Sequence, residues 1–207
     1  MIEVQECEKH RLIGGALCLD FANTLNGHNR EPHHEYIHDY SDLVRWCVHA
    51  GSLSREVIEC YLENGQEHPR KAKAVYESAL FLRELIFRVF QSVVSGNLVS
   101  PQDLEQLASI WKEGQTNSRL LQTINGFCLN WGDADVMRQP LFPISASAIN
   151  LLTSMTVQRI RLCAGHHCDW LFIDNSRNHL RHWCSMDECG NQAKMKRRRI
   201  GKSVAGN

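Results

Sequence analysis

Several features of secreted and membrane proteins are missing from this chain of 207 residues. No segment approaches the roughly 20 consecutive apolar residues that a membrane-spanning helix needs. The N-terminus, residues 1–6, is acidic and lacks the basic start and apolar stretch of a signal peptide. No internal repeat is present, and the basic run at 194–199 is the only low-complexity segment. We therefore expect a folded cytoplasmic protein with no membrane partner.

Net charge is missing too, because 23 Lys and Arg residues balance 23 Asp and Glu residues. The balance conceals two parts of opposite sign. From Thr156 onward, ten basic and four acidic residues give a net charge of +6, and the rest of the chain carries −6. Opposite charges indicate two modules with different partners, and the basic module is the candidate for binding a polyanion. We place the boundary so that the domains are residues 1–154 and 155–207.

Cysteine, in contrast, is plentiful, with nine residues. In a reducing compartment such cysteines are metal ligands, catalytic thiols or buried small residues more often than disulfides. Two pairs, each enclosing four residues, lie near the C-terminus, with fifteen residues between the pairs. Zinc binds four thiolates at the corners of a tetrahedron. The spacing predicts one structural zinc ion bound by Cys163, Cys168, Cys184 and Cys189.

Two alternatives to this site remain open. The cysteines could be ordinary core residues, or one ligand could be a histidine, from His166, His167 or His182. A catalytic zinc is disfavoured, because four thiolates leave no open coordination position for water or substrate. Trp170, Phe172 and Trp183 could stack on nucleic-acid bases, but we interpret them as the finger's small core.

The fold class predicted from periodicity is mainly α. Helices are expected at 42–50 with Ser41 as cap, at 54–65, at Pro69–Ser95, from Pro101 onward and at 145–154. Short strands are expected at 127–131, 136–141, 157–162 and 170–173, and a last helix follows Gly190. A helical N-terminal domain with a few short strands would thus precede a small treble-clef-like α+β zinc finger.

The finger segment also contains longer motifs. CDWLFID at 168–174, SRN at 176–178, RHWCSM at 181–186 and CGN at 189–191 resemble the CGNR-type zinc finger. The segments LDFANTL at 19–25 and LRE at 82–84 are similar to the helical ABATE domain. This family is regarded as bacterial transcription regulators, with DNA binding inferred from the basic finger. The name-giving motif ends in arginine, whereas this chain has Gln192, which removes one basic contact.

The basic residues of the finger are the candidate nucleic-acid contacts. A helix after Gly190 could lie against the phosphate backbone or enter the major groove. The candidates are Arg177, Arg181, Lys194, Lys196, Arg197, Arg198 and Arg199. The alternatives are a solvated basic tail and a docking surface for an acidic partner protein.

The N-terminal domain would sense a small-molecule effector or form a homodimer. Asp20, Asn23 and Thr24 lie among apolar neighbours at helical spacing and could line a ligand pocket, although satisfied buried hydrogen bonds are the alternative. The histidine-rich segment 28–38 could hold metal ligands at His34 and His38, or form an exposed polar loop. No nucleophile–base arrangement, phosphate loop or paired carboxylates stand out, so we expect no enzyme.

Overall fold

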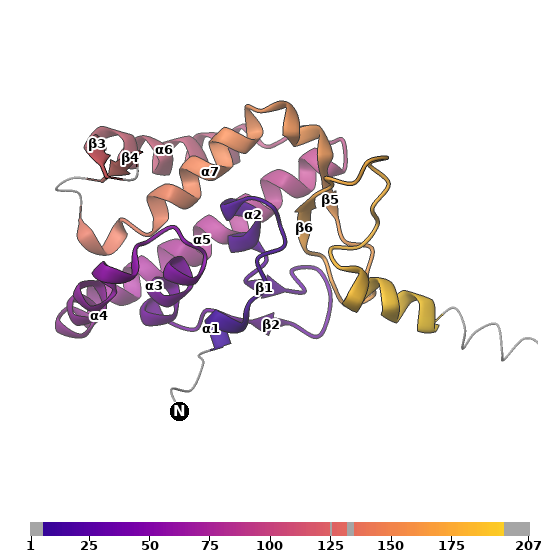
Figure 1. Cartoon of the computed structure of the whole chain (residues 1–207), viewed down its shortest axis with the longest axis horizontal. Coiled ribbons are helices and arrows are strands. Elements are labelled where there is room, and N and C mark those ends of the chain that lie inside the picture. The colour runs from indigo at the N-terminus through magenta and orange to yellow at the C-terminus, as the bar shows by residue number, and fades with distance from the viewer. Residues whose placement is uncertain (1–5, 125, 132–134, 197–207) are drawn as a thin grey trace, which may run out of the picture.

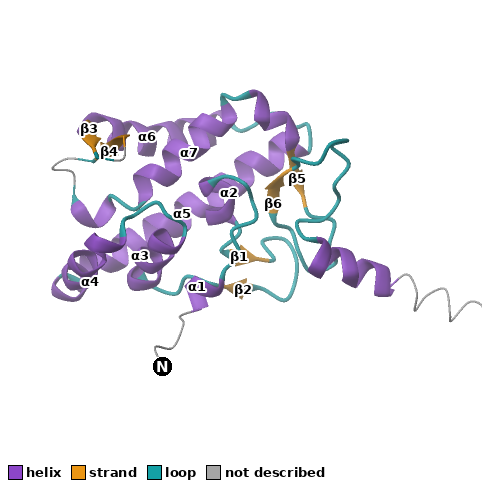
Figure 2. Ribbon diagram, in the orientation of Figure 1, coloured by secondary structure: helices purple, strands orange, loops and turns teal. Residues whose placement is uncertain are grey.

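The computed structural model describes residues 6–124, 126–131 and 135–196, which are mostly helical. The N-terminal helices pack around one long central helix, and the C-terminal segment lies at one end (Figures 1 and 2). In chain order the helices are α1 (Glu6–Lys9), α2 (Leu17–Ala22), α3 (Tyr40–His49), α4 (Ile58–Glu67), α5 (Pro69–Val94), α6 (Pro101–Asn117) and α7 (Leu141–Leu152). The mainly α fold class is therefore confirmed.

The strands form three separate antiparallel pairs. They are β1 (Leu25–Asn26) with β2 (His34–Glu35), β3 (Arg119–Thr123) with β4 (Gly126–Asn130), and β5 (Ile160–Leu162) with β6 (Leu171–Ile173). Short 3-10 helices are η1 (Arg55–Val57), η2 (Val136–Arg138) and η3 (Met155–Arg159). The π-helical turn η4 (Met186–Gly190) continues into an α-helix at 191–196. Within the described residues, no helix combines the length and apolar character needed to cross a bilayer.

Helix α5 organises the N-terminal part, as its periodicity predicts. Val75, Leu82 and Ile86 belong to a stripe that repeats every three or four residues and is almost fully buried. The helix ends in a Schellman motif, in which Asn97 N–H donates to the Ser92 carbonyl at 2.9 Å and Gly96 has a φ of +70°. Helices α2, α3, α4, α6 and α7 all contact α5. The helix predicted at Pro69–Ser95 is confirmed.

Local hydrogen bonds decided two helix starts that we predicted wrongly. Helix α3 begins at Tyr40 and is capped by Asp39, whose carboxylate accepts from the Asp42 backbone N–H at 2.9 Å; Ser41 is not the cap. The strand predicted at 136–141 is instead η2 and the beginning of α7. Asp135 accepts from the Met137 N–H and starts a helical turn there. Met137 and Leu141, four residues apart, are both buried, which is a helical spacing.

The hydrophobic core extends from the helices into the finger's small sheet. Ile160 of β5 and Leu171 and Ile173 of β6 belong to the same buried cluster as α5. Cys18 and Cys47, predicted as buried small residues, are completely buried, and burial raises the pKa of each thiol to about 12. The two-domain division at 154/155 falls between α7 and η3 and stays a prediction, as does the treble-clef-like topology.

Candidate metal centre

Four cysteines from separate parts of the finger meet at one point. Cys163 follows β5, Cys168 precedes β6, and Cys184 and Cys189 lie just before and within η4. Their sulfur atoms all lie within 4.8 Å of one another, and all four residues are buried. In the described part of the chain, this is the one cluster of three or more His, Cys, Asp or Glu residues with metal-binding geometry.

The sulfur positions fit a tetrahedral zinc ion. Four sulfurs at about 2.3 Å from a central zinc would lie about 3.8 Å from each other. The Sγ–Sγ distance is 3.7 Å between Cys168 and Cys184 and 3.8 Å between Cys184 and Cys189. A disulfide would need about 2 Å, and all four cysteines are free. The site therefore has the size and the donor atoms for one structural zinc ion.

The backbone around Cys163 is arranged to hold a negatively charged sulfur. The N–H groups of Gly165 and Cys184 donate to its Sγ at 3.4 and 3.3 Å. Gly165 allows a close approach, because a Cβ there would lie only 3.0 Å from the Cys189 sulfur. The pKa of the Cys163 thiol is lowered by hydrogen bonds from the neighbouring cysteines, Cys168 first, while the same contacts raise the pKa of Cys184. The four neighbouring thiols therefore resist losing all their protons together, because the negatively charged sulfurs would repel one another. A divalent cation between them offsets this repulsion.

The aromatic residues of the finger pack around the cysteines, as predicted. Phe172 is fully buried, Trp170 is 6% exposed and Trp183 is half-buried against the same cluster. Tyr36 and Ile13 of the N-terminal part complete this small core. The rings therefore stabilise the finger and are not a free stacking platform.

Arg181 contributes to the shape of the second cysteine loop. Its guanidinium lies 4.7 Å from the centre of the Phe172 ring. It donates to the Trp183 carbonyl at 2.8 Å and also to the Cys184 carbonyl. These contacts use the side chain within the finger, although we had predicted it as a nucleic-acid contact from its charge and its position between the two cysteine pairs.

Arg177 lies on an exposed loop that Asp174 organises. The Asp174 carboxylate accepts from the Ser176 N–H and hydroxyl at 2.9 and 2.6 Å, and from the Arg181 N–H at 2.9 Å. Burial alone would raise the pKa of Asp174, but these bonds lower it to about 2. The loop is therefore held in place, and Arg177 at its tip is exposed.

Lys194 and Lys196 are exposed on the helix at 191–196, together with Gln192. Arg197, Arg198 and Arg199, which we predicted as contacts on the same helix, lie outside the described residues. In the described structure, Arg177, Lys194 and Lys196 are therefore the predicted contacts that present their charges to solvent.

A loop of the N-terminal part holds the first cysteine loop. Asp169, which is 1% exposed, accepts from the backbone N–H groups of Gly27 and Asn29 at 3.0 and 2.8 Å. The Arg30 guanidinium donates to the Cys168 carbonyl at 2.9 Å and also to the Gly165 carbonyl. Sequence reasoning missed these residues, because neither a backbone N–H nor an arginine in a polar loop reveals in the sequence which distant residue it will contact.

The trio Asp20, Asn23 and Thr24 is engaged in internal hydrogen bonds. Asn23 donates to the Leu171 carbonyl at 2.9 Å and accepts from the Leu171 N–H at 2.8 Å. Asp20 accepts from the Gly14 N–H at 2.7 Å, and Thr24 donates to the Phe21 carbonyl at 2.7 Å. These contacts match the alternative of satisfied buried polar groups.

The histidine-rich segment does not form the helical metal pair that we considered. His34 lies in β2 and His38 precedes α3, so the two share no helix face. His28 is buried between the Ala22 carbonyl and the Glu84 carboxylate, at 2.9 and 3.0 Å, and stacks on Phe87. Its surroundings are structural.

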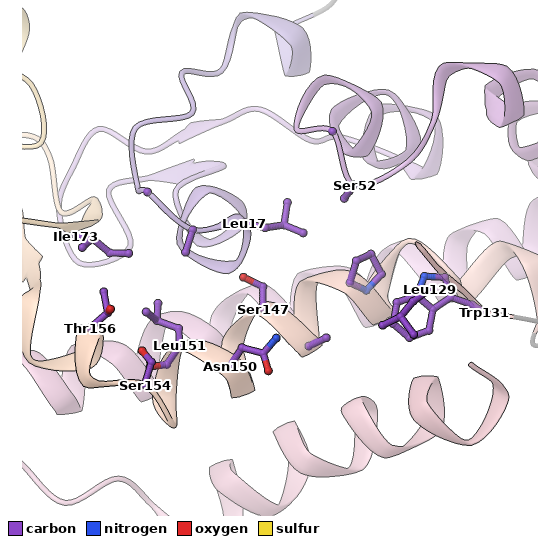
Figure 3. Close-up of a pocket in the computed structure, with 15 residues that line it drawn as sticks. Leu17, Ser52, Leu129, Trp131, Ser147, Asn150, Leu151, Ser154, Thr156 and Ile173 are labelled. Carbon is purple, nitrogen blue, oxygen red and sulfur yellow. The ribbon is translucent and has the colours of Figure 1, made fainter. Parts of the chain in front are cut away.

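An open groove of about 720 Å³ lies between the start of α2, helix α7 and strand β6 (Figure 3). Leu17 lies opposite Ser147 of α7, and Ile173 of the finger's sheet is at one end. Trp131 and Leu129 line the other end. The predicted pocket residues Asp20, Asn23 and Thr24 do not line this groove.

Comparison with known families agrees with the motifs. Residues 15–155 match the ABATE model, described as a putative stress-induced transcription regulator, and residues 159–200 match the CGNR zinc finger. Neither is a family of enzymes. No curated protein is similar enough to the chain to count as a match. The zinc-finger match and the cluster of four sulfurs together identify one structural zinc ion per chain. Because the ABATE model matches well over half of the chain, the chain belongs to the ABATE family, with a CGNR zinc finger at its C-terminal end.

Proposed function

We propose that this chain is a transcription regulator that binds DNA through its zinc finger. Cys163, Cys168, Cys184 and Cys189 act as the four zinc ligands in this proposal. The metal fixes a segment whose apolar content is too small to fold alone, and so presents its basic side chains together. The proposed DNA contacts are Arg177, Lys194 and Lys196, with Arg197, Arg198 and Arg199 further along.

The observation that carries the proposal is that the described basic side chains of the finger are not paired with carboxylates of the N-terminal part. Among the described residues, no lysine or arginine after 155 forms an ion pair with a carboxylate of the N-terminal part. In the described ion pair between the two parts, the N-terminal part supplies the cation, Arg11, and the finger supplies the carboxylate, Glu188, at 2.7 Å. The exposed cations Arg177, Lys194 and Lys196 are therefore available for phosphates, in a segment whose sequence carries a net charge of +6.

The N-terminal domain would regulate this binding, by sensing an effector or by forming a dimer. The groove at α7 supports the first role, because Ile173 of the finger's sheet contributes to its lining. A ligand there would contact both the helical part and the strand that follows the first cysteine loop.

Replacement of Arg197, Arg198 and Arg199 by alanine tests the DNA proposal. Neutralising about five phosphates gives a slope of log affinity against log salt of roughly −4 to −5. The triple variant should bind duplex DNA more weakly and with a slope reduced by about 3. The control variant replaces Arg55, Arg70 and Lys73 by alanine. All three are exposed on the N-terminal part, so this variant loses the same amount of positive charge. Equal affinity of the finger variant and the wild type would reject the proposal.

The competing function is a zinc-stabilised docking module for an acidic partner protein. The separation of charge between the two parts favours it as the second candidate. Duplex DNA and an acidic polypeptide distinguish the two, because the docking module would bind the polypeptide and leave duplex DNA unbound at physiological salt.

A further inference from the structure

The hairpin of β3 and β4 exposes apolar side chains that soluble monomers normally bury. Every residue of both strands is exposed. Leu120 is 68% exposed and Phe127 is 70% exposed. Leu121, Ile124 and Leu129 add exposed fractions of 44%, 101% and 49%. Apolar side chains gathered in this way mark an interaction surface, whereas single exposed ones do not.

The pairing register places apolar residues on both faces of the hairpin. Leu120 lies opposite Leu129, and Phe127 lies opposite Gln122, so these side chains share one face. Leu121 lies opposite Cys128 on the other face. An isolated pair of strands is marginally stable in water and needs a further strand or a packed face. The described structure provides no third strand for this sheet.

The hairpin is almost without charge. Arg119 is the only charged residue from 119 to 131, in a chain of which 22% is charged. Exposed strand edges are usually protected by charged residues or proline, and neither interrupts this segment after Arg119. A neutral apolar surface does not suit nucleic acid or an acidic peptide. Its complement is another apolar strand pair.

The size of the surface matches one half of a protein interface. Five apolar residues with these exposed fractions leave on the order of 600 Å² of surface, summed over the two faces of the hairpin. A standard interface takes about 800 Å² from each partner. A partner that covers both faces of the hairpin therefore contacts an area close to one side of a standard interface.

We propose that this hairpin binds the same hairpin of a second copy, so that the chain forms a homodimer. Antiparallel pairing of one strand edge with its own copy is two-fold symmetric, which is the usual symmetry of homodimers. The inference names the surface for the dimer role proposed above and does not depend on DNA binding. The hairpin and the finger helix lie at opposite ends of the molecule (Figure 1), so both fingers of the dimer remain accessible.

Sedimentation equilibrium of the zinc-loaded chain of 207 residues tests the inference. Leu120→Lys and Phe127→Lys place a charge in the centre of the interface, and each should raise the dimer dissociation constant by at least about 30-fold. Leu98→Lys is the matched control, because Leu98 is 99% exposed in the loop between α5 and α6. The control should dimerise like the wild type. Since all three residues are exposed, circular dichroism should report unchanged folding.

Three results would overturn the inference. A wild type that stays monomeric at its highest soluble concentration would reject both the dimer role and this surface. A dimer that persists in both hairpin variants would reject the surface alone. Equal dissociation of Leu98→Lys would show that added charge, and not its position, separates the subunits. Loss of DNA binding with an intact dimer would count against the proposed function and leave this inference standing.

Discussion

At the scale of single residues, two arginines with the same charge have different surroundings. Arg181 stacks on Phe172 and donates to two backbone carbonyls beside the zinc ligand Cys184. Arg177 is exposed at the tip of the loop that Asp174 organises. One arginine therefore supports the metal site, and the other is available to a phosphate.

Replacing each arginine by alanine should separate these roles. Arg181→Ala removes a partner of the metal-binding loop, and such partners typically contribute 10- to 100-fold to metal affinity. We expect it to lose zinc to a competing chelator at about a tenfold lower chelator concentration. Arg177→Ala should retain zinc like the wild type and bind DNA more weakly. Equal zinc retention by the two variants would contradict the role assigned to Arg181.

Asp20 gives a prediction for pH. Burial raises the pKa of its carboxyl from 3.8 to about 6, although the Gly14 N–H donated to it partly opposes the shift. At pH values between 3.8 and about 6, the folded chain therefore holds a proton that the unfolded chain has released. The free energy of unfolding falls as pH rises through this window.

Asp20→Asn should remove this dependence. Relative to the wild type, the variant should gain about 1 kcal/mol of stability between about pH 5 and pH 7.5. Urea unfolding of both proteins at the two pH values measures the change. A stability difference that is the same at both values would refute the raised pKa.

At the scale of elements, sequence prediction succeeded where a signal was local and long. The stripe of α5 repeats over 26 residues, and the spacing of four cysteines predicts the zinc site. Strand β3 was missed because its five residues, RLLQT, do not alternate between apolar and polar side chains. Asn23 and Leu171 are 148 positions apart, and only the tertiary fold brings the side chain to that backbone.

The loop at 27–30 should respond to zinc although it binds none. The acceptors of the Gly27 and Asn29 amides belong to Asp169, next to the zinc ligand Cys168. Removal of the metal should loosen the cysteine loop, so these two amides should exchange faster with deuterium. Buried amides of α5, such as that of Leu82, should keep their protection and serve as the internal control. Unchanged exchange at 27–30 after chelation would contradict this coupling.

At the scale of the whole molecule, charge and apolar surface are separated. The finger, whose sequence is basic, lies at one end, and the hairpin, with Arg119 as its one charged residue, is exposed at the other (Figure 1). The helical part between them contributes the groove and the loop that contacts the first cysteine loop. This arrangement suits a protein that binds a polyanion at one end and a second copy at the other.

The most direct test of the central claim is the affinity for duplex DNA as a function of salt, measured for the zinc-loaded and the chelated protein. The zinc-loaded protein should bind with a slope of log affinity against log salt of roughly −4 to −5, and chelation should weaken binding because the basic side chains are no longer held together. A slope near zero, or equal affinity with and without zinc, would contradict the account.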